Sequence, residues 1–323
     1  MAWFNFRRSA STAPRHTGSE PPILAGRFRL GTRIAEGADS EVMAGVDLRT
    51  GRDVAVKLVG LPPDMPGSQR QEWLARLRRE AELGRRLAHP DIVAVLDAGL
   101  RGHTAWMAME RVRGHDLSRY IQPQRLLPEA EVLHIGARVA NALAYAHVQG
   151  VVHRDLKPAN VMINLAAHQV KLADFGVARL DDTSVTRTGL TLGTPAYMAP
   201  ELLQGAAASA ASDGYALGVM LFELLAGRRP HQADTLGELL RSTAQGTPAS
   251  LAQLRPDMPA PTIKAVEWLL ARNPARRPAD LSAWASHVEA LAALMTRLLA
   301  PSLPRQGQEA AGLGETRRLP KAP

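Results

Sequence analysis

The sequence carries the stretch His153-Arg154-Asp155-Leu156-Lys157-Pro158-Ala159-Asn160, followed further on by Asp174-Phe175-Gly176. These residues supply carboxylates, a carboxamide, a lysine and an arginine within a short distance along the chain. Phosphoryl transfer from a nucleoside triphosphate needs these groups. A carboxylate must orient and deprotonate the acceptor hydroxyl, and oxygen ligands must hold Mg²⁺ on the phosphates. The stretch therefore predicts a phosphotransferase site.

The same residues resemble the catalytic loop and the metal-binding loop of eukaryotic-like serine/threonine protein kinases, of the type also found in bacteria. The resemblance covers about residues 28–298. It implies an α+β, bilobal protein-kinase fold over residues 27–299. A small, β-rich N-lobe with one main helix would span about 27–110, and a larger, mainly helical C-lobe would span about 113–299.

Composition is compatible with one such domain. The chain has 323 residues, 46% of them hydrophobic and none of them cysteine, so the sequence excludes disulfides and thiolate metal sites. No apolar run reaches the roughly 18 residues of a membrane-spanning helix, and the best candidate, 215–226, contains Glu223. The N-terminus makes a poor signal peptide. We therefore expect a cytoplasmic protein without a membrane partner.

The net charge of +8 and the isoelectric point near 10.4 raise the question of nucleic-acid binding. The basic residues are scattered, however, and the sequence contains no nucleic-acid-binding motif. A solvated basic surface is the favoured interpretation, with no nucleic-acid partner.

Both ends of the chain differ in composition from the middle. Residues 1–26 are rich in Ser, Thr, Pro and Arg, and residues 300–323 are rich in Pro, Gly and charged residues. They predict a flexible, basic N-terminal tail and a disordered C-terminal tail. Thr316 is a candidate site for a phosphothreonine-binding partner, although a purely disordered end is the favoured interpretation.

The expected phosphate-covering loop is degraded. The family pattern is G-x-G-x-x-G-x-V, and the corresponding sequence here is Ala35-Glu36-Gly37-Ala38-Asp39-Ser40-Glu41-Val42. Taken alone, this segment predicts an ordinary hairpin. The strand Val54-Ala55-Val56-Lys57 follows it, and the resemblance implies that Lys57 binds the α- and β-phosphates of ATP. Without the later motifs, a solvated lysine at a strand end would be the better interpretation.

A helix is predicted over about residues 69–88. One face carries residues at helical spacing, namely Trp73, Leu77, Glu80, Gly84 and Leu87. A glutamate on an apolar face requires a partner, and the resemblance implies an ion pair between Glu80 and Lys57. Glu72 and Glu82 are alternatives, but Glu82 shares its stripe with arginines and fits a solvated face. Gly84 weakens the helix by about 1 kcal/mol relative to alanine, which suggests a helix that is easily displaced.

The resemblance also implies an adenine pocket. Met109 would be the gatekeeper residue, and the backbone of Glu110 and Val112 in the interlobe hinge would bond the adenine ring. The faces of the ring would pack against Val42, Ala55 and Met162. These apolar residues would belong to the core of any fold, so their role rests on the resemblance alone.

The roles in the C-lobe follow from the same resemblance. Asp155 would orient the acceptor hydroxyl and take its proton, and Lys157 would stabilise charge on the transferred group. Asn160 and Asp174 would bind Mg²⁺. Lys157-Pro158 favours the serine/threonine branch over tyrosine kinases and over small-molecule phosphotransferases.

The segment between Asp174 and Glu201 reads as an activation loop. Val185-Thr186-Arg187-Thr188 matches a pair of threonines that bacterial relatives autophosphorylate, so Thr186 and Thr188 are predicted phosphorylation sites. Arg154 would bind the added phosphate. Thr194 would bond toward Asp155 and Lys157.

Two further residues are expected to have scaffold roles. Glu201 would pair with Arg277, and Asp213 would support the catalytic loop.

Three functions remain open at this stage. The leading one is an ATP- and Mg²⁺-dependent serine/threonine kinase that acts on protein substrates and autophosphorylates, with a homodimer as a possible intermediate of that reaction. The alternatives are a kinase-fold scaffold with weak or no catalysis, and a transferase acting on small molecules. The presence of Lys57, Asp155, Asn160 and Asp174 together argues against the scaffold.

Overall fold

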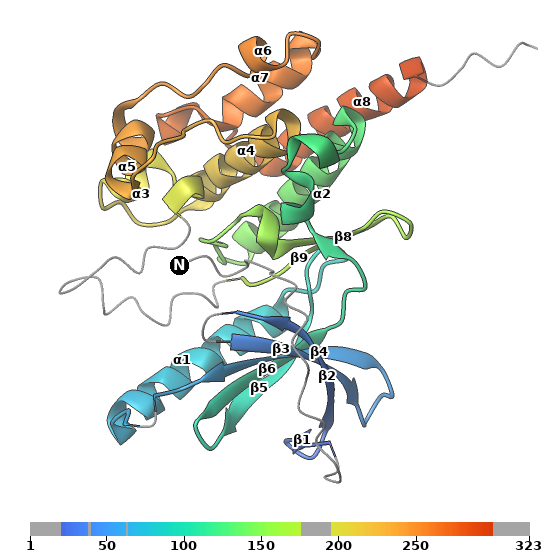
Figure 1. The fold of residues 1–323 in the computed structure, drawn as a ribbon, viewed down its shortest axis with the longest axis vertical. Coiled ribbons are helices and arrows are strands. Elements are labelled where there is room, and N and C mark those ends of the chain that lie inside the picture. The colour runs from blue at the N-terminus through green and yellow to red at the C-terminus, as the bar shows by residue number, and fades with distance from the viewer. Residues whose placement is uncertain (1–20, 38–39, 63, 176–194, 300–323) are drawn as a thin grey trace, which may run out of the picture.

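The computed structural model describes residues 21–37, 40–62, 64–175 and 195–299. It has two lobes joined by a short hinge at residues 110–114 (Figure 1). The N-lobe holds a six-stranded antiparallel sheet in the order β1-β2-β3-β4-β6-β5. Its strands are β1 (Ile23–Leu24), β2 (Phe28–Glu36), β3 (Ser40–Asp47), β4 (Asp53–Gly60), β5 (Val95–Arg101) and β6 (Thr104–Glu110). The predicted β-rich N-lobe is confirmed.

Alternation along β6 divides the N-lobe core into two layers, because successive strand residues face opposite sides of a sheet. Trp106 and Ala108 pack with Phe28, Val54 and Val56 on one face. The intervening residues Ala105 and Met107 pack on the other face, against the helix α1. The N-lobe helix is thus held by one side of the sheet only.

Helix α1 (Gly67–Arg86) is the predicted main helix of the N-lobe, and it begins and ends slightly earlier than expected. Glu82 is exposed and pairs with Arg86 at 2.8 Å, which confirms its solvated position. Gly84 contacts strand β5, and a Cβ atom there would lie 2.7 Å from Cγ2 of Val95. The structure therefore gives this glycine a packing reason in addition to its effect on helix propensity. Only glycine allows the helix to lie so close to the strand.

The C-lobe is built around helix α4 (Ala210–Ala226), which is buried continuously from Ser212 to Leu225. Around it lie α2 (Glu129–Val148), α7 (Ala260–Leu269) and α8 (Leu281–Leu299). Shorter helices, α3 (Pro200–Leu203), α5 (Leu236–Gln245) and α6 (Leu251–Leu254), lie at its periphery. The predicted mainly helical C-lobe is confirmed.

A second small sheet lies where the lobes meet. Its order is β7-β8-β9, with β7 at His115–Asp116, β8 at Val161–Asn164 and β9 at Gln169–Leu172. The hinge reaches it through Gly114, where a Cβ atom would lie only 2.1 Å from the carbonyl oxygen of Ile163. Side-chain-free backbone at this position lets the hinge lie directly against β8, between the two lobes.

The segment between α1 and β5 belongs to the N-lobe in sequence but is bound to the C-lobe. Val93 donates its amide proton to the carbonyl of Leu172 at 2.9 Å. The amide of Leu172 donates in turn to the backbone carbonyl of Asp91 at 2.8 Å. Arg138 of α2 forms an ion pair with Asp91. This segment therefore connects the two lobes independently of the hinge.

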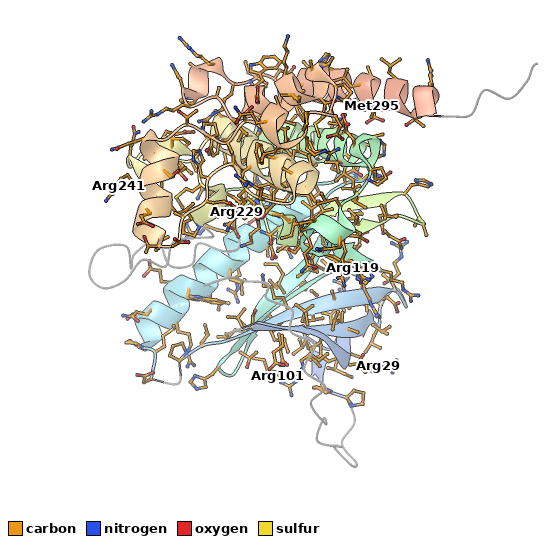
Figure 2. All side chains as sticks on the ribbon, turned by 45° about the horizontal axis from the view of Figure 1, so that its top comes forward. Arg29, Arg101, Arg119, Arg229, Arg241 and Met295 are labelled. Atoms are coloured by element: carbon orange, nitrogen blue, oxygen red, sulfur yellow. The ribbon has the colours of Figure 1, made fainter. Side chains whose placement is uncertain are left out.

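Basic side chains are spread over both lobes. Arg29 and Arg101 on the N-lobe sheet and Arg241 on α5 are all exposed, and Figure 2 shows Arg241 on the C-lobe, away from the two N-lobe arginines. Among the described residues, no helix combines the length and the apolar character that crossing a bilayer requires.

Two predicted scaffold contacts are confirmed. Arg277 binds both carboxylate oxygens of Glu201, at 2.6 and 2.8 Å, and donates to the carbonyl of Ala211. Asp213 accepts hydrogen bonds from the backbone amides of His153 and Arg154 at 2.8 and 2.9 Å.

The buried pair gives a prediction about stability. Replacement Arg277→Met removes the guanidinium of a side chain that is 1% exposed, and it leaves the Glu201 carboxylate and several carbonyls without their donor. We expect the free energy of unfolding in urea to fall by about 3–5 kcal/mol. The control Arg276→Met alters an exposed neighbour and should change it by less than about 0.5 kcal/mol. Equal losses in the two variants would contradict the assigned role of the pair.

Candidate active site

The catalytic loop, residues 153–160, is anchored by the carboxylate of Asp213, a residue near the start of α4 that is 1% exposed. Besides the two backbone amides, this carboxylate lies 2.8 Å from Nε2 of His147 on α2. Arg154 has a φ of +68°, a left-handed conformation that a non-glycine residue adopts at a cost. The hydrogen bonds to Asp213 hold the loop in this turn.

The loop brings three predicted residues together. Nζ of Lys157 lies 2.6 Å from Oδ2 of Asp155. Asn160, in the short 3₁₀ turn Pro158–Asn160, donates its amide to the backbone oxygen of Asp155 at 2.7 Å and to Oδ2 at 3.2 Å. Lys157 and Asn160 are buried, whereas the side chain of Asp155 is 16% exposed. The Asp155 carboxylate is thus held by two buried donors, and its exposed part can still contact a hydroxyl that accepts the phosphoryl group.

Asp174 follows β9 and also has a left-handed backbone, with a φ of +60°. Both its carboxylate oxygens lie 3.1 Å from Nζ of Lys57, which projects from β4. The sequence motifs predict that Lys57 and Asp174 belong to one site, but not that they contact each other. The predicted partner, Glu80, lies on α1, and its side chain is outside the described residues, so the Lys57–Glu80 pair stays a prediction.

Phe175, next to Asp174, packs against the ring of His153 with the ring centroids 4.7 Å apart. Nε2 of His153 donates to the carbonyl of Ala173 at 3.0 Å. The catalytic loop and the Asp174 loop therefore contact each other through both a ring pair and a hydrogen bond. Sequence motifs identify these residues but not the contact between them.

The donor set fits a Mg²⁺ ion bound with a nucleotide. Oδ1 of Asn160 is buried and has no hydrogen-bond partner in the structure, so it is an acceptor that a cation could use. Mg²⁺ prefers oxygen ligands, and it commonly takes one or two carboxylates together with substrate phosphates. Asn160 and Asp174 offer an amide oxygen and a carboxylate, which are oxygen donors that Mg²⁺ accepts. Among the described residues, no group of three or more His, Cys, Asp or Glu side chains could hold a metal by itself.

The β2–β3 hairpin carries the predicted phosphate-covering loop. Gly37 donates its amide proton to the carbonyl of Ser40 at 2.7 Å, and Ala35 pairs with Val42 across the two strands. Glu36 is 65% exposed and pairs with Arg33 at 3.1 Å, so its side chain lies on the surface. Residues 38 and 39 at the tip are outside the described part of the chain.

Strand register places the predicted adenine-contacting residues of the N-lobe together. Val42 lies opposite Lys57, and Ala55 lies opposite Met109. Opposite residues in antiparallel strands share a face, as do residues two apart in one strand. Val42, Ala55, Lys57 and Met109 therefore line one side of the sheet.

The remaining predicted adenine contacts come from the hinge and the C-lobe. Glu110 is the last residue of β6, and Val112 follows in the hinge. Met162 lies on β8 and pairs with Asp116 of β7, so the small sheet at the lobe boundary presents it.

The part of the predicted activation loop that the structure describes, from residue 195 onward, is anchored in the C-lobe. The hydroxyl of Tyr197 bonds Oε2 of Glu223 on α4, and Nε of Arg229 lies 3.7 Å from the other oxygen of that carboxylate. Burial raises the pKa of Tyr197, and the Glu223 charge adds to this effect, so the phenol keeps its proton and donates it. Burial also raises the pKa of Glu223, against the opposing effects of Tyr197 and Arg229.

Arg154 is exposed and forms no ion pair with another described residue. The predicted phosphorylation sites Thr186 and Thr188, and also Thr194, lie outside the described residues.

Comparison with known proteins agrees with this geometry. Residues 28–289 match the family model for the protein kinase domain. A probable serine/threonine-protein kinase of Corynebacterium efficiens is 36% identical over 282 residues, which are 85% of this chain and 42% of that protein. The serine/threonine-protein kinase PknA of Mycobacterium tuberculosis is 38% identical over 260 residues, or 79% of this chain and 58% of that protein. The chain thus spans only part of the length of these curated relatives.

A crystal structure of the PknI kinase domain of Mycobacterium tuberculosis is similar in fold, with a TM-score of 0.65 at 30% identity. The match covers 84% of this chain and 98% of that one. The sequence matches, the bilobal fold and the arrangement of Asp155, Lys157, Asn160 and Asp174 agree. The chain belongs to the protein kinase family, among the bacterial serine/threonine kinases.

Proposed function

We propose that this chain is an ATP-dependent protein kinase that transfers the γ-phosphoryl group to serine or threonine hydroxyls of proteins. The observation that carries the proposal is the cluster in which Lys157 and Asn160 fix Asp155, beside a second carboxylate, Asp174, bound to Lys57. Kinase catalysis consists of positioning and charge stabilisation, and these residues supply both.

The chain's own residues would divide the work as follows. Asp155 holds the acceptor hydroxyl and takes its proton as the oxygen attacks phosphorus. Lys157 neutralises charge on the transferred group, and its contact with Asp155 keeps the ammonium beside the reacting atoms. Lys57 binds the phosphates that leave, and the hinge backbone at Glu110 and Val112 holds the adenine. Bound Mg²⁺, held by Asn160 and Asp174, would supply charge neutralisation on the phosphate oxygens.

Regulation by the activation loop is part of the proposal. Phosphate on Thr186 or Thr188 would give exposed Arg154 a counter-ion directly beside the catalytic aspartate. Autophosphorylation would pass through a transient homodimer, and a phosphothreonine-binding protein could then recognise the product. We place the reaction in the cytoplasm and assign the folded unit to residues 27–299.

The first test concerns the proposed base. Replacement Asp155→Asn keeps the size of the side chain but removes the proton acceptor, so the rate should fall roughly 100-fold or more. The measurement is incubation of the full chain with ATP and Mg²⁺, followed by mapping of phosphosites by mass spectrometry. Phosphorylation of the wild type alone is expected. Equal phosphorylation of both proteins would contradict the assignment, and silence of both would favour a scaffold.

A second test concerns the loop threonines. The double replacement Thr186→Ala, Thr188→Ala leaves Arg154 without its phosphate partner. Loss of one charge-assisted hydrogen bond, worth about 1.5 kcal/mol, would lower kcat/KM about tenfold. Kinetics on a peptide substrate check this, with Thr183→Ala, Ser184→Ala as the matched control from the same loop. Full activity of the first variant would remove the regulatory role.

The third test concerns the metal. Replacement Asn160→Ala removes the unpaired buried oxygen, and we expect the Mg²⁺ concentration for half-maximal activity to rise about tenfold. A titration of activity against Mg²⁺ at saturating ATP measures this. Asn141→Ala, which alters an exposed position on α2, is the control. An unchanged Mg²⁺ requirement together with an unchanged melting temperature would argue against Asn160 as a ligand.

A further inference from the structure

The side chain of Glu110 connects parts of the molecule that belong to different lobes. Glu110 ends strand β6, and its backbone amide donates to the carbonyl of Ala94 at 2.8 Å. Its carboxylate oxygen Oε2 accepts from the amide of Ala94 at 3.3 Å and from Nζ of Lys171 at 2.7 Å. Lys171 lies on β9, in the sheet at the base of the other lobe.

Lys171 makes a second contact that closes this group. Its ammonium also donates to the carbonyl of Ile92 at 3.3 Å, two residues before Ala94, which is hydrogen-bonded to Glu110. The side chain of Lys171 is 11% exposed, and that of Glu110 is 29% exposed. A buried lysine costs desolvation unless it has a partner, and Glu110 is the acidic partner here.

The two residues lie at informative positions along the chain. The backbone of Glu110 is the proposed contact for adenine. Lys171 lies near the end of β9, shortly before Asp174, the proposed metal ligand. Leu172 lies between them and is hydrogen-bonded to the backbone of Asp91 and Val93. The ion pair therefore joins the hinge, which would hold the adenine, to the strand that leads to the proposed metal ligand.

The hinge is also attached to the C-lobe at its C-terminal end, through Arg113 and Gly114. Gly114 lies against the carbonyl of Ile163, and Asn164 donates to the carbonyl of Arg113 at 2.6 Å. Among the described contacts, the Glu110–Lys171 pair is the one that links the start of the hinge to β9 through side chains.

We propose that Glu110 and Lys171 form a positioning pair for the nucleotide, which sets the hinge backbone relative to Asp174. This proposal rests on the proposed kinase function. The pair does not touch the reacting atoms. It acts by keeping the base site and the metal-binding loop at the separation that one bound nucleotide requires.

The test is a double-mutant cycle in the full chain. The variants are Lys171→Met, Glu110→Gln and the two combined, with Lys171→Arg as the conservative replacement. Calorimetry with ADP and Mg²⁺ gives the dissociation constant, steady-state kinetics separate KM for ATP from kcat, and thermal unfolding gives the melting temperature. Lys264→Met and Glu267→Gln, which make the same changes at exposed positions of α7, are the matched controls.

We expect each single variant to weaken ADP binding about tenfold and to raise KM for ATP by a similar factor, with kcat changed by less than about threefold. The double variant should be no weaker than either single one, because both remove the same contact. Lys171→Arg should restore affinity to within about threefold, and the controls should bind as the wild type does.

Three results would overturn the positioning role. A lower melting temperature with an unchanged dissociation constant would make the pair merely structural. Additive losses in the double variant would show that the residues act separately. Tighter nucleotide binding in the variants would mean that the pair opposes binding. If the wild type itself binds no nucleotide, the proposed function fails together with this inference, which distinguishes that case from the other three.

Discussion

The active site depends on one buried carboxylate. Asp213 lies in the core at the start of α4, and a charge in that position is stable only with a full set of donors. Those donors are the backbone amides of His153 and Arg154 and the ring of His147. The catalytic loop supplies two of the three donors. The hydrogen bonds that stabilise the buried carboxylate are therefore the same ones that fix the conformation of the loop. Asp155 then follows directly from the anchored backbone, and Lys157 and Asn160 complete its environment. A helix that is otherwise a core element thus determines where the proposed base lies.

Much of this could be predicted from the sequence because the motifs are local. Asp155, Lys157 and Asn160 lie within one short loop, and any fold that keeps the loop keeps them together. The Glu201–Arg277 pair and the role of Asp213 join distant residues, and they were predicted only through the family resemblance. The sequence does not predict contacts that depend on how distant strands and helices lie against one another. The Lys57–Asp174 pair requires β4 and the end of β9 to meet across the lobe boundary. The packing role of Gly84 requires knowledge of Val95, which lies on a different strand.

The two lobes are joined by more than the hinge. The segment at residues 91–94 continues from the N-lobe helix yet bonds to β9 and, through Asp91, to α2. Because these hydrogen bonds are short-ranged and directional, they hold residues 91–93 against the C-lobe, although Ala94 already bonds Glu110 of the N-lobe sheet. The hinge approaches the same region from the other side, with Gly114 against Ile163. Any relative movement of the lobes is therefore restricted at two separate points, and the space between β4 and β9 is where the proposed nucleotide site lies.

Two of the four non-glycine residues with positive φ in the described chain are Arg154 and Asp174. Each lies within or beside the proposed catalytic groups, and a left-handed conformation at such a residue costs about 1 kcal/mol or more. The native fold is consequently less stable than its packing alone would allow. Glycine at either position would relieve the strain, and at Asp174 it would also remove a proposed ligand. Stability and the proposed chemistry therefore make opposite demands on the residue at these two positions.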